Sequence, residues 1–217
     1  HTMENLVKII IYIHAFFGAI GLIAGTVIMF AKKGNQLHKK AGEIFSLGML
    51  VSSVLSLLIC SFPNHHNSFL LMIGIFTIYM ILLGNRVLKY KRKNHHNKID
   101  QLISGIMMIT SIIMIVYGIS PLFTNQGLGI LFMIFGGLGG FMSYRDFKFY
   151  KNPENYKKWT MVHVGKMVGA YIASVTAFLV AGAGFGGNIY FWIVPSVIGT
   201  LYIIAWGRKL NKKVVVN

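Results

Sequence analysis

LVKIIIYIHAFFGAIGLIAGTVIMFA, residues 6–31, is an apolar stretch in which Lys8 is the one charged side chain. An α-helix needs about 20 apolar residues to cross the hydrocarbon core of a bilayer, and this stretch is long enough. It is also longer than the apolar core of a signal peptide, and no basic segment precedes it. We therefore expect a transmembrane helix that the protein retains.

Further apolar runs follow along the chain. They lie at residues 43–62, 68–88, 100–121, 127–144, 161–183 and 188–207. Each run is continuously apolar, whereas the strands of a membrane barrel alternate in polarity. Hydrophobic residues make up 55% of the 217 residues and charged residues only 12%, which leaves no room for a separate soluble domain. The sequence predicts a single all-α transmembrane domain over 1–217, a polytopic bundle of about seven helices.

The loops between these runs alternate strictly between two kinds. All but one of the 21 Lys and Arg residues lie in or beside every second loop or at the carboxyl end, and the other loops contain none. Lys and Arg are retained on the cytoplasmic side during membrane insertion. We therefore expect the amino terminus outside and the carboxyl terminus in the cytoplasm, in the inner (cytoplasmic) membrane of a bacterial cell.

The net charge of +16 is distributed in a way that argues against nucleic-acid binding. The basic residues lie in short loops next to apolar runs, so the expected partners are membrane lipids, with anionic head groups at the cytoplasmic loops. Basic and aromatic side chains near the span ends, among them Lys166 and Trp206, are expected to anchor the helices at the interface. A second copy of the chain or another membrane protein is a further candidate partner.

Glycines in two of the spans fall on one helical face each. The first span contains Gly18, Gly21 and Gly25, and the fifth contains Gly129, Gly136 and Gly140. Spacings of three, four and seven residues place each set on one side of a helix. Because a missing side chain lets two backbones approach, we expect close helix–helix contacts at both faces.

His14 is the histidine that lies most clearly inside a span. Its neighbours at i+4, i+7 and i+11 are Gly18, Gly21 and Gly25, so its side chain should face another helix. Two interpretations remain open. His14 is a haem ligand or a quinone hydrogen-bonding group, or it makes an ordinary interhelical hydrogen bond.

His38 and His163 form the second candidate site. His38 lies just before the second span and His163 opens the sixth, so both are expected near the cytoplasmic surface. A bis-histidine haem needs two imidazoles at one depth from different helices, and this pair meets that condition. The alternative is that both are interfacial residues at loop ends.

Carboxylates are scarce and are placed away from mid-membrane. Glu43, Asp100 and Asp146 lie near cytoplasmic ends of spans, and Glu4 is external. This pattern argues against a proton-coupled transporter and against hydrolysis by paired carboxylates. The pairs His65-His66 and His95-His96 lack the further ligands that a metal needs, so we expect no metal site, and no catalytic motif is recognised.

Residues 38–42, HKKAG, together with His14 in the first span and His163 after a later basic loop, form an arrangement with a known counterpart. It resembles a family of predicted bacterial membrane proteins, domain of unknown function 2306. The family motif typically reads His-Arg-x-x-Gly, so Lys39 departs from it while Gly42 keeps the spacing. The resemblance covers mainly the first two spans and implies no particular activity.

Three functional hypotheses follow. The first is a protein that binds a hydrophobic cofactor or lipid in its bundle, with haem b or quinone held by His163 and His38, or by His14 alone. The second is a channel or facilitator for a small solute, flanked by the glycine faces and lined by hydroxyl side chains. Those hydroxyls are Ser52, Ser56, Thr77, Thr110, Ser111, Ser174 and Thr176. The third is an accessory membrane subunit.

Overall fold

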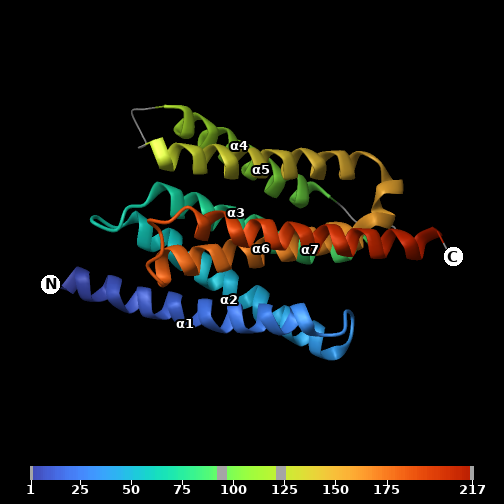
Figure 1. Ribbon diagram of the computed structural model, residues 1–217, viewed down its shortest axis with the longest axis horizontal. Coiled ribbons are helices and arrows are strands. Elements are labelled where there is room, and N and C mark those ends of the chain that lie inside the picture. Colours follow the sequence, from blue (N-terminus) through green and yellow to red (C-terminus); the bar gives the residue numbers. More distant parts are fainter. Residues whose placement is uncertain (1, 92–96, 121–125, 216–217) are drawn as a thin grey trace. The chain divides into compact units, whose positions relative to one another are not determined.

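The computed structural model describes residues 2–91, 97–120 and 126–215. These residues form seven α-helices, and none of them lies in a strand, which confirms the all-α prediction (Figure 1). The helices are α1 (Thr2–Phe30), α2 (Gln36–Ser61), α3 (Ser68–Arg86), α4 (Lys98–Ile119), α5 (Gln126–Lys151), α6 (Trp159–Ala177) and α7 (Tyr190–Val215). Two 3-10 segments, η1 (Val87–Lys91) and η2 (Pro153–Lys158), and a π-helical segment, η3 (Phe178–Gly182), adjoin them. Arg92, Lys93 and the His95-His96 pair lie outside the described residues.

Each predicted apolar run corresponds to one helix, but several helices extend beyond their runs. α2 begins at Gln36 rather than at residue 43, because the side chain of Asn35 caps it by accepting a hydrogen bond from the His38 backbone amide at 2.8 Å. α5 likewise continues past residue 144 to Lys151. Apolar runs mark the part of a helix that suits lipid, whereas capping groups decide where the helix ends.

Six helical stretches among the described residues are long and apolar enough to cross a membrane. They are Met3–Phe30, Gln36–Ser61, Ser68–Lys91, Lys98–Ile119, Pro153–Gly182 and Tyr190–Leu210. α5 is not among them, and its last part contains Arg145, Asp146, Lys148 and Lys151. The described chain thus has the helices of a multi-pass membrane protein.

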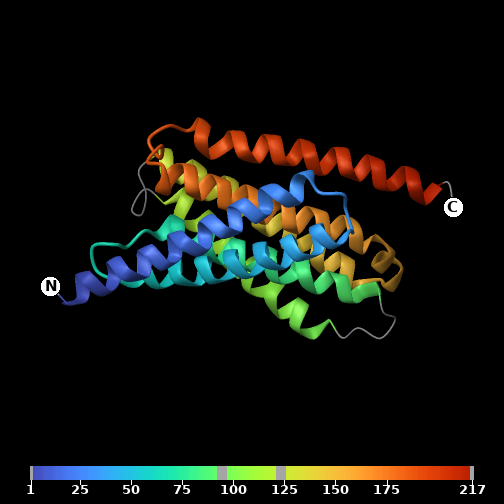
Figure 2. The ribbon, with the colours of Figure 1, turned by 90° about the horizontal axis from the view of Figure 1, so that it is seen from below.

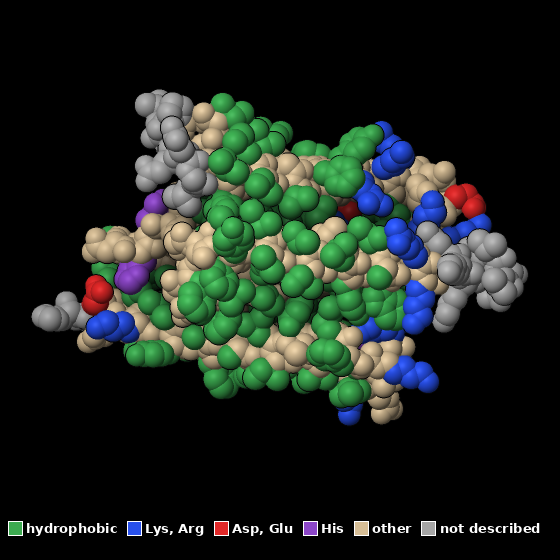
Figure 3. All heavy atoms as spheres, in the orientation of Figure 1, with side chains coloured by type: hydrophobic (Ala, Val, Ile, Leu, Met, Phe, Trp, Pro, Cys, Tyr) green, Lys and Arg blue, Asp and Glu red, His purple; other side chains and the backbone are tan. Residues whose placement is uncertain are grey.

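The surface along these helices is apolar. Hydrophobic side chains cover most of the helical surface that is visible in Figure 3. Large side chains such as Phe30, which is 87% exposed, and Leu102, which is 63% exposed, have little protein cover. Contiguous exposure of this kind is unusual in a soluble monomer and is normal where lipid is the solvent.

Contacts between Cα atoms divide the chain into two compact units. The first unit comprises residues 1–81 and 164–217, and the second comprises residues 82–163. That a single domain comprises residues 1–217 stays a prediction.

In the first unit, the glycine face of α1 packs against α2, and the two helices run side by side in Figures 1 and 2. A Cβ atom added to Gly21 would lie 2.6 Å from Cε of Met49. From the other side, a Cβ on Gly48 would lie 2.9 Å from the Phe17 carbonyl oxygen. Real Cβ atoms essentially never lie within 3.0 Å of such atoms, so only glycine fits at these two positions without a shift of its neighbours. The prediction of a close helix contact is therefore confirmed for the first span.

In the second unit, α4 packs against α5 in the same manner. A Cβ on Gly136 would lie 3.0 Å from the Ser111 carbonyl oxygen, and one on Gly118 would lie 2.7 Å from the Gly129 carbonyl oxygen. A Cβ on Gly140 would make only an ordinary contact, 3.6 Å from Cβ of Ser111. The fifth-span prediction is therefore confirmed most clearly at Gly136, and α4 also approaches the backbone of Gly129 closely.

Candidate functional site

His14 lies on α1 with its imidazole against α2, in the first unit. Its Nδ1 lies 2.8 Å from the main-chain carbonyl oxygen of Ser52 and 3.0 Å from the Ser52 hydroxyl, and that hydroxyl donates to the His14 carbonyl at 3.1 Å. A carbonyl oxygen only accepts, so Nδ1 carries the proton. This is the interhelical hydrogen bond expected as the alternative to a ligand role. It uses one ring nitrogen only.

His163 is the last residue of the second unit and is half-buried on α6. Its Nδ1 lies 2.7 Å from the carbonyl oxygen of Gly84, near the end of α3. The same argument assigns the proton to Nδ1. The neutral ring then has its lone pair on Nε2.

His38 lies in the first turn of α2, where its backbone amide donates to the Asn35 side chain. It belongs to the first unit and His163 to the second. The pairing of His38 with His163 therefore stays a prediction.

The shared geometry of His14 and His163 is the one that metal-binding imidazoles use. Such a histidine usually donates one ring N–H to a carbonyl or carboxylate, which fixes the ring and leaves the other nitrogen as the ligand atom. Both rings satisfy this condition through main-chain carbonyls of neighbouring helices. The donor atoms therefore fit the iron of a haem. The same unprotonated Nε2 can accept a hydrogen bond from the hydroxyl group of a quinol. It cannot donate one to the carbonyl oxygen of a quinone.

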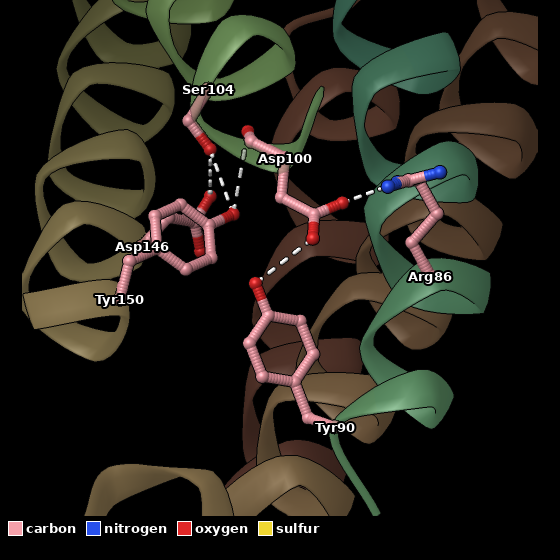
Figure 4. A network of polar contacts seen from close by, with 6 residues as sticks. All are labelled: Arg86, Tyr90, Asp100, Ser104, Asp146 and Tyr150. Carbon is pink, nitrogen blue, oxygen red and sulfur yellow. Dashed lines mark hydrogen bonds and ion pairs between the residues drawn. The ribbon is translucent and has the colours of Figure 1, made fainter. Parts of the chain in front are cut away.

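A set of buried polar side chains joins α4 to its neighbours in the second unit. We call it the α4 polar network, and it consists of Arg86, Tyr90, Asp100, Ser104, Asp146 and Tyr150 (Figure 4). The Asp100 carboxylate, 1% exposed, accepts from Nε of Arg86 and from the Tyr90 hydroxyl, the latter at 2.9 Å. This carboxylate therefore ties the end of α3 and segment η1 to the start of α4.

The other half of the α4 polar network joins α4 to α5. The Ser104 hydroxyl donates to Oδ2 of Asp146 at 3.2 Å and lies 3.1 Å from the Tyr150 hydroxyl. The Tyr150 hydroxyl also lies 3.5 Å from the Asp100 carbonyl oxygen, so the two halves are continuous. Asp146 is only 5% exposed. Buried carboxylates with hydrogen-bond donors from several helices hold those helices together.

Sequence reasoning noted where Asp100 and Asp146 lie along the chain and missed their burial. A usable signal was present in the spacing. Asp100 and Ser104 are four residues apart on α4, and Asp146 and Tyr150 are four apart on α5, so each pair shares a helical face. Two polar faces on adjacent antiparallel spans, among apolar residues, indicate a contact between those faces.

Lys166 corrects one sequence-based expectation. It was expected to anchor α6 at the interface, but it is only 3% exposed. Its Nζ lies 4.0 Å from the ring centroid of Tyr79 on α3 and donates to the Tyr79 hydroxyl, both within the first unit. An aromatic face and a hydroxyl together accommodate the ammonium group, which explains how it is buried among apolar helices.

The hydroxyls proposed to line a solute path mostly bond within their own helices. Ser56, Thr77, Thr110 and Ser174 donate to carbonyls three or four residues earlier. Ser52 is engaged with His14, and the glycine faces are covered by packed helices. These five hydroxyls are satisfied without water or solute, whereas those of Ser111 and Thr176 are buried without a hydrogen-bond partner among the described residues.

Among the described residues, no three His, Cys, Asp or Glu side chains gather into a group that could hold a metal ion. The chain matches no family model, no curated protein and no solved structure. The resemblance to domain of unknown function 2306 stays a prediction.

Proposed function

We propose that the chain is a seven-span protein of a bacterial cytoplasmic membrane, with α5 as the seventh span and the amino terminus outside. The strict alternation of basic and uncharged loops supports this orientation. An odd number of spans is needed to place the two termini on opposite sides. Anionic head groups at the cytoplasmic loops, and a second copy of the chain or another membrane protein, are the proposed partners.

Cysteine labelling tests this topology, because Cys60 is the one cysteine in the chain and is buried. In a Cys60→Ser background, Pro63→Cys lies in an expected external loop and Gln36→Cys in an expected cytoplasmic one, and both positions are exposed. We expect a membrane-impermeant maleimide to label Pro63→Cys in intact cells. Gln36→Cys should react only after permeabilisation, and the reverse pattern would invert the topology.

We further propose that the protein binds a hydrophobic redox cofactor through a neutral imidazole, a b-type haem first and a quinol second. The supporting observation is that Nδ1–H of His163 donates to the Gly84 carbonyl at 2.7 Å, which leaves Nε2 as the ligand atom. His14 has the same arrangement on α1. A haem held in this way supplies one-electron transfer within the membrane.

An optical spectrum of the detergent-purified protein tests the haem. We expect a Soret band and a reduced-minus-oxidised difference, with His163→Ala removing most of both because the ligand nitrogen is lost. His66→Ala is the matched control, since both of its ring nitrogens already have partners, the Cys60 carbonyl at 3.2 Å and the Ser68 hydroxyl at 3.0 Å. The control should keep the wild-type spectrum.

Parallel variants separate the candidate ligands. Loss of the bands in His14→Ala, with His163→Ala unchanged, would move the site to α1. Loss in both His38→Ala and His163→Ala would support the predicted pair. A wild-type protein from haem-supplemented cells with no Soret band would remove the haem proposal and leave the quinol.

A further inference from the structure

The carboxyl-terminal part of α1 borders an apolar groove in the first unit. The groove has a volume of about 510 Å³ and is lined by Ile23, Thr26, Val27, Phe30, Ala31 and Leu37. The one polar side chain, Thr26, has its hydroxyl 2.7 Å from the hydroxyl of Tyr171 and accordingly offers little to a polar ligand. Ile23 is 66% exposed and Phe30 is 87% exposed, so these lining side chains are accessible from outside the protein.

Two lysines lie at one end of this groove. Lys32 and Lys33 directly follow the lining residue Ala31 and precede the lining residue Leu37. The Lys33 Nζ donates to the carbonyl oxygens of Ile28 and Met29, the latter at 3.0 Å. A lysine that caps the last carbonyls of a helix is held in place, so its positive charge has a defined position.

Aromatic side chains of α7 lie close to Lys33, because Tyr202 and Trp206 contact the end of α1 and the residues that follow it. The Nζ of Lys33 lies 5.6 Å from the ring centroid of Trp206 and 6.0 Å from that of Tyr202. Lys209 lies over the same Trp206 ring at 4.9 Å. Trp and Tyr beside Lys are typical of the level of the membrane where lipid head groups lie.

We propose that this groove binds one acyl chain of an anionic phospholipid, with the lipid phosphate against Lys32, Lys33 and Lys209. The apolar lining matches the chain, and the cluster of positive charge at one end favours a lipid with net negative charge over a zwitterionic one. The inference rests on the proposed membrane location and orientation. It is independent of the haem or quinol site.

Native mass spectrometry of the detergent-purified protein, titrated with phosphatidylglycerol or with phosphatidylcholine of the same chains, tests the inference. We expect one phosphatidylglycerol to be retained several-fold more tightly than phosphatidylcholine. The variant Lys32→Gln/Lys209→Gln alters two exposed lysines and should weaken phosphatidylglycerol binding by about five-fold per lysine, from roughly 1 kcal/mol for each charge. The capping Lys33 stays unchanged, so that α1 keeps its end.

A second variant tests the groove and a third controls for charge. Val27→Trp fills the groove and should weaken the binding of both lipids. Lys157→Gln/Lys158→Gln removes two exposed lysines from η2 in the second unit and should leave binding unchanged. Equal retention of the two lipids, or an equal loss in the η2 control, would overturn the inference.

Fractionation of lysed cells without detergent separates a failure of the lipid site from a failure of the proposed membrane location. A protein that fractionates with membranes but shows no lipid preference contradicts the lipid site alone. A protein that stays in the supernatant without detergent contradicts the membrane proposal itself.

Discussion

Asp100→Asn should lower the free energy of unfolding of the detergent-solubilised protein by about 3 kcal/mol, the low end of what breaking a buried ion pair costs. The substitution leaves the Arg86 guanidinium without its counter-charge and removes one strong acceptor from the Tyr90 hydroxyl. We choose the low end because the Arg86 side chain is 19% exposed and water can partly compensate it. Titration with sodium dodecyl sulfate, followed by circular dichroism, measures the change.

The exposed ion pair of η2 is the matched control for that experiment. Nζ of Lys157 lies 2.6 Å from Oε2 of Glu154, but the two side chains are 79% and 73% exposed. Surface pairs of this kind contribute little, so Glu154→Gln should unfold at the wild-type detergent fraction. If the Asp100→Asn and Glu154→Gln variants had the same free energy of unfolding, the α4 polar network would not be what joins α3 and η1 to α4.

Gly48→Leu should destabilise the packing of α1 on α2 by about 3 kcal/mol, the upper part of the usual range for overpacking. A Cβ at this position meets main-chain atoms of α1, the Phe17 carbonyl oxygen at 2.9 Å and the Gly21 nitrogen at 3.1 Å. Backbone atoms cannot rotate away as a flexible side chain can. The two helices must therefore separate, and the hydrogen bonds of His14 with Ser52 should weaken with them.

Gly42→Ala on the same helix is the control, because a Cβ there meets nothing within 4 Å. Alanine is a better helix former than glycine by about 1 kcal/mol, so this variant should be as stable as the wild type or slightly more stable. Thermal unfolding of the two variants in one detergent compares them. Equal midpoints would show that α1 and α2 do not approach as closely as Gly21 and Gly48 indicate.

Much of the helical architecture is predictable from the sequence because lipid sets a simple length requirement. The run 6–31 identifies α1, and the spacing of Gly18, Gly21 and Gly25 identifies the face that another helix covers. The same pattern does not identify that helix. Gly48 is an isolated glycine of α2 whose role appears only when α1 lies against it.

The candidate sites are less predictable, because their geometry depends on atoms that are distant in the chain. The sequence places His163 at the start of a span, but the carbonyl that fixes its tautomer belongs to Gly84 on another helix. Likewise, Asp100 reads as an ordinary charged residue at a span end. Its burial follows from Arg86, Tyr90 and the neighbouring helices, which hydropathy along one segment does not reveal.

The division of the chain also bears on the order in which the protein forms during synthesis. Residues 82–163 are continuous, so every partner within the second unit is available once η2 and the start of α6 have been made. The first unit has no such advantage, because residues 1–81 need residues 164–217 to complete it. The surfaces of the first three helices that α6 and α7 cover in the first unit therefore have no such cover until the end of the chain has been made.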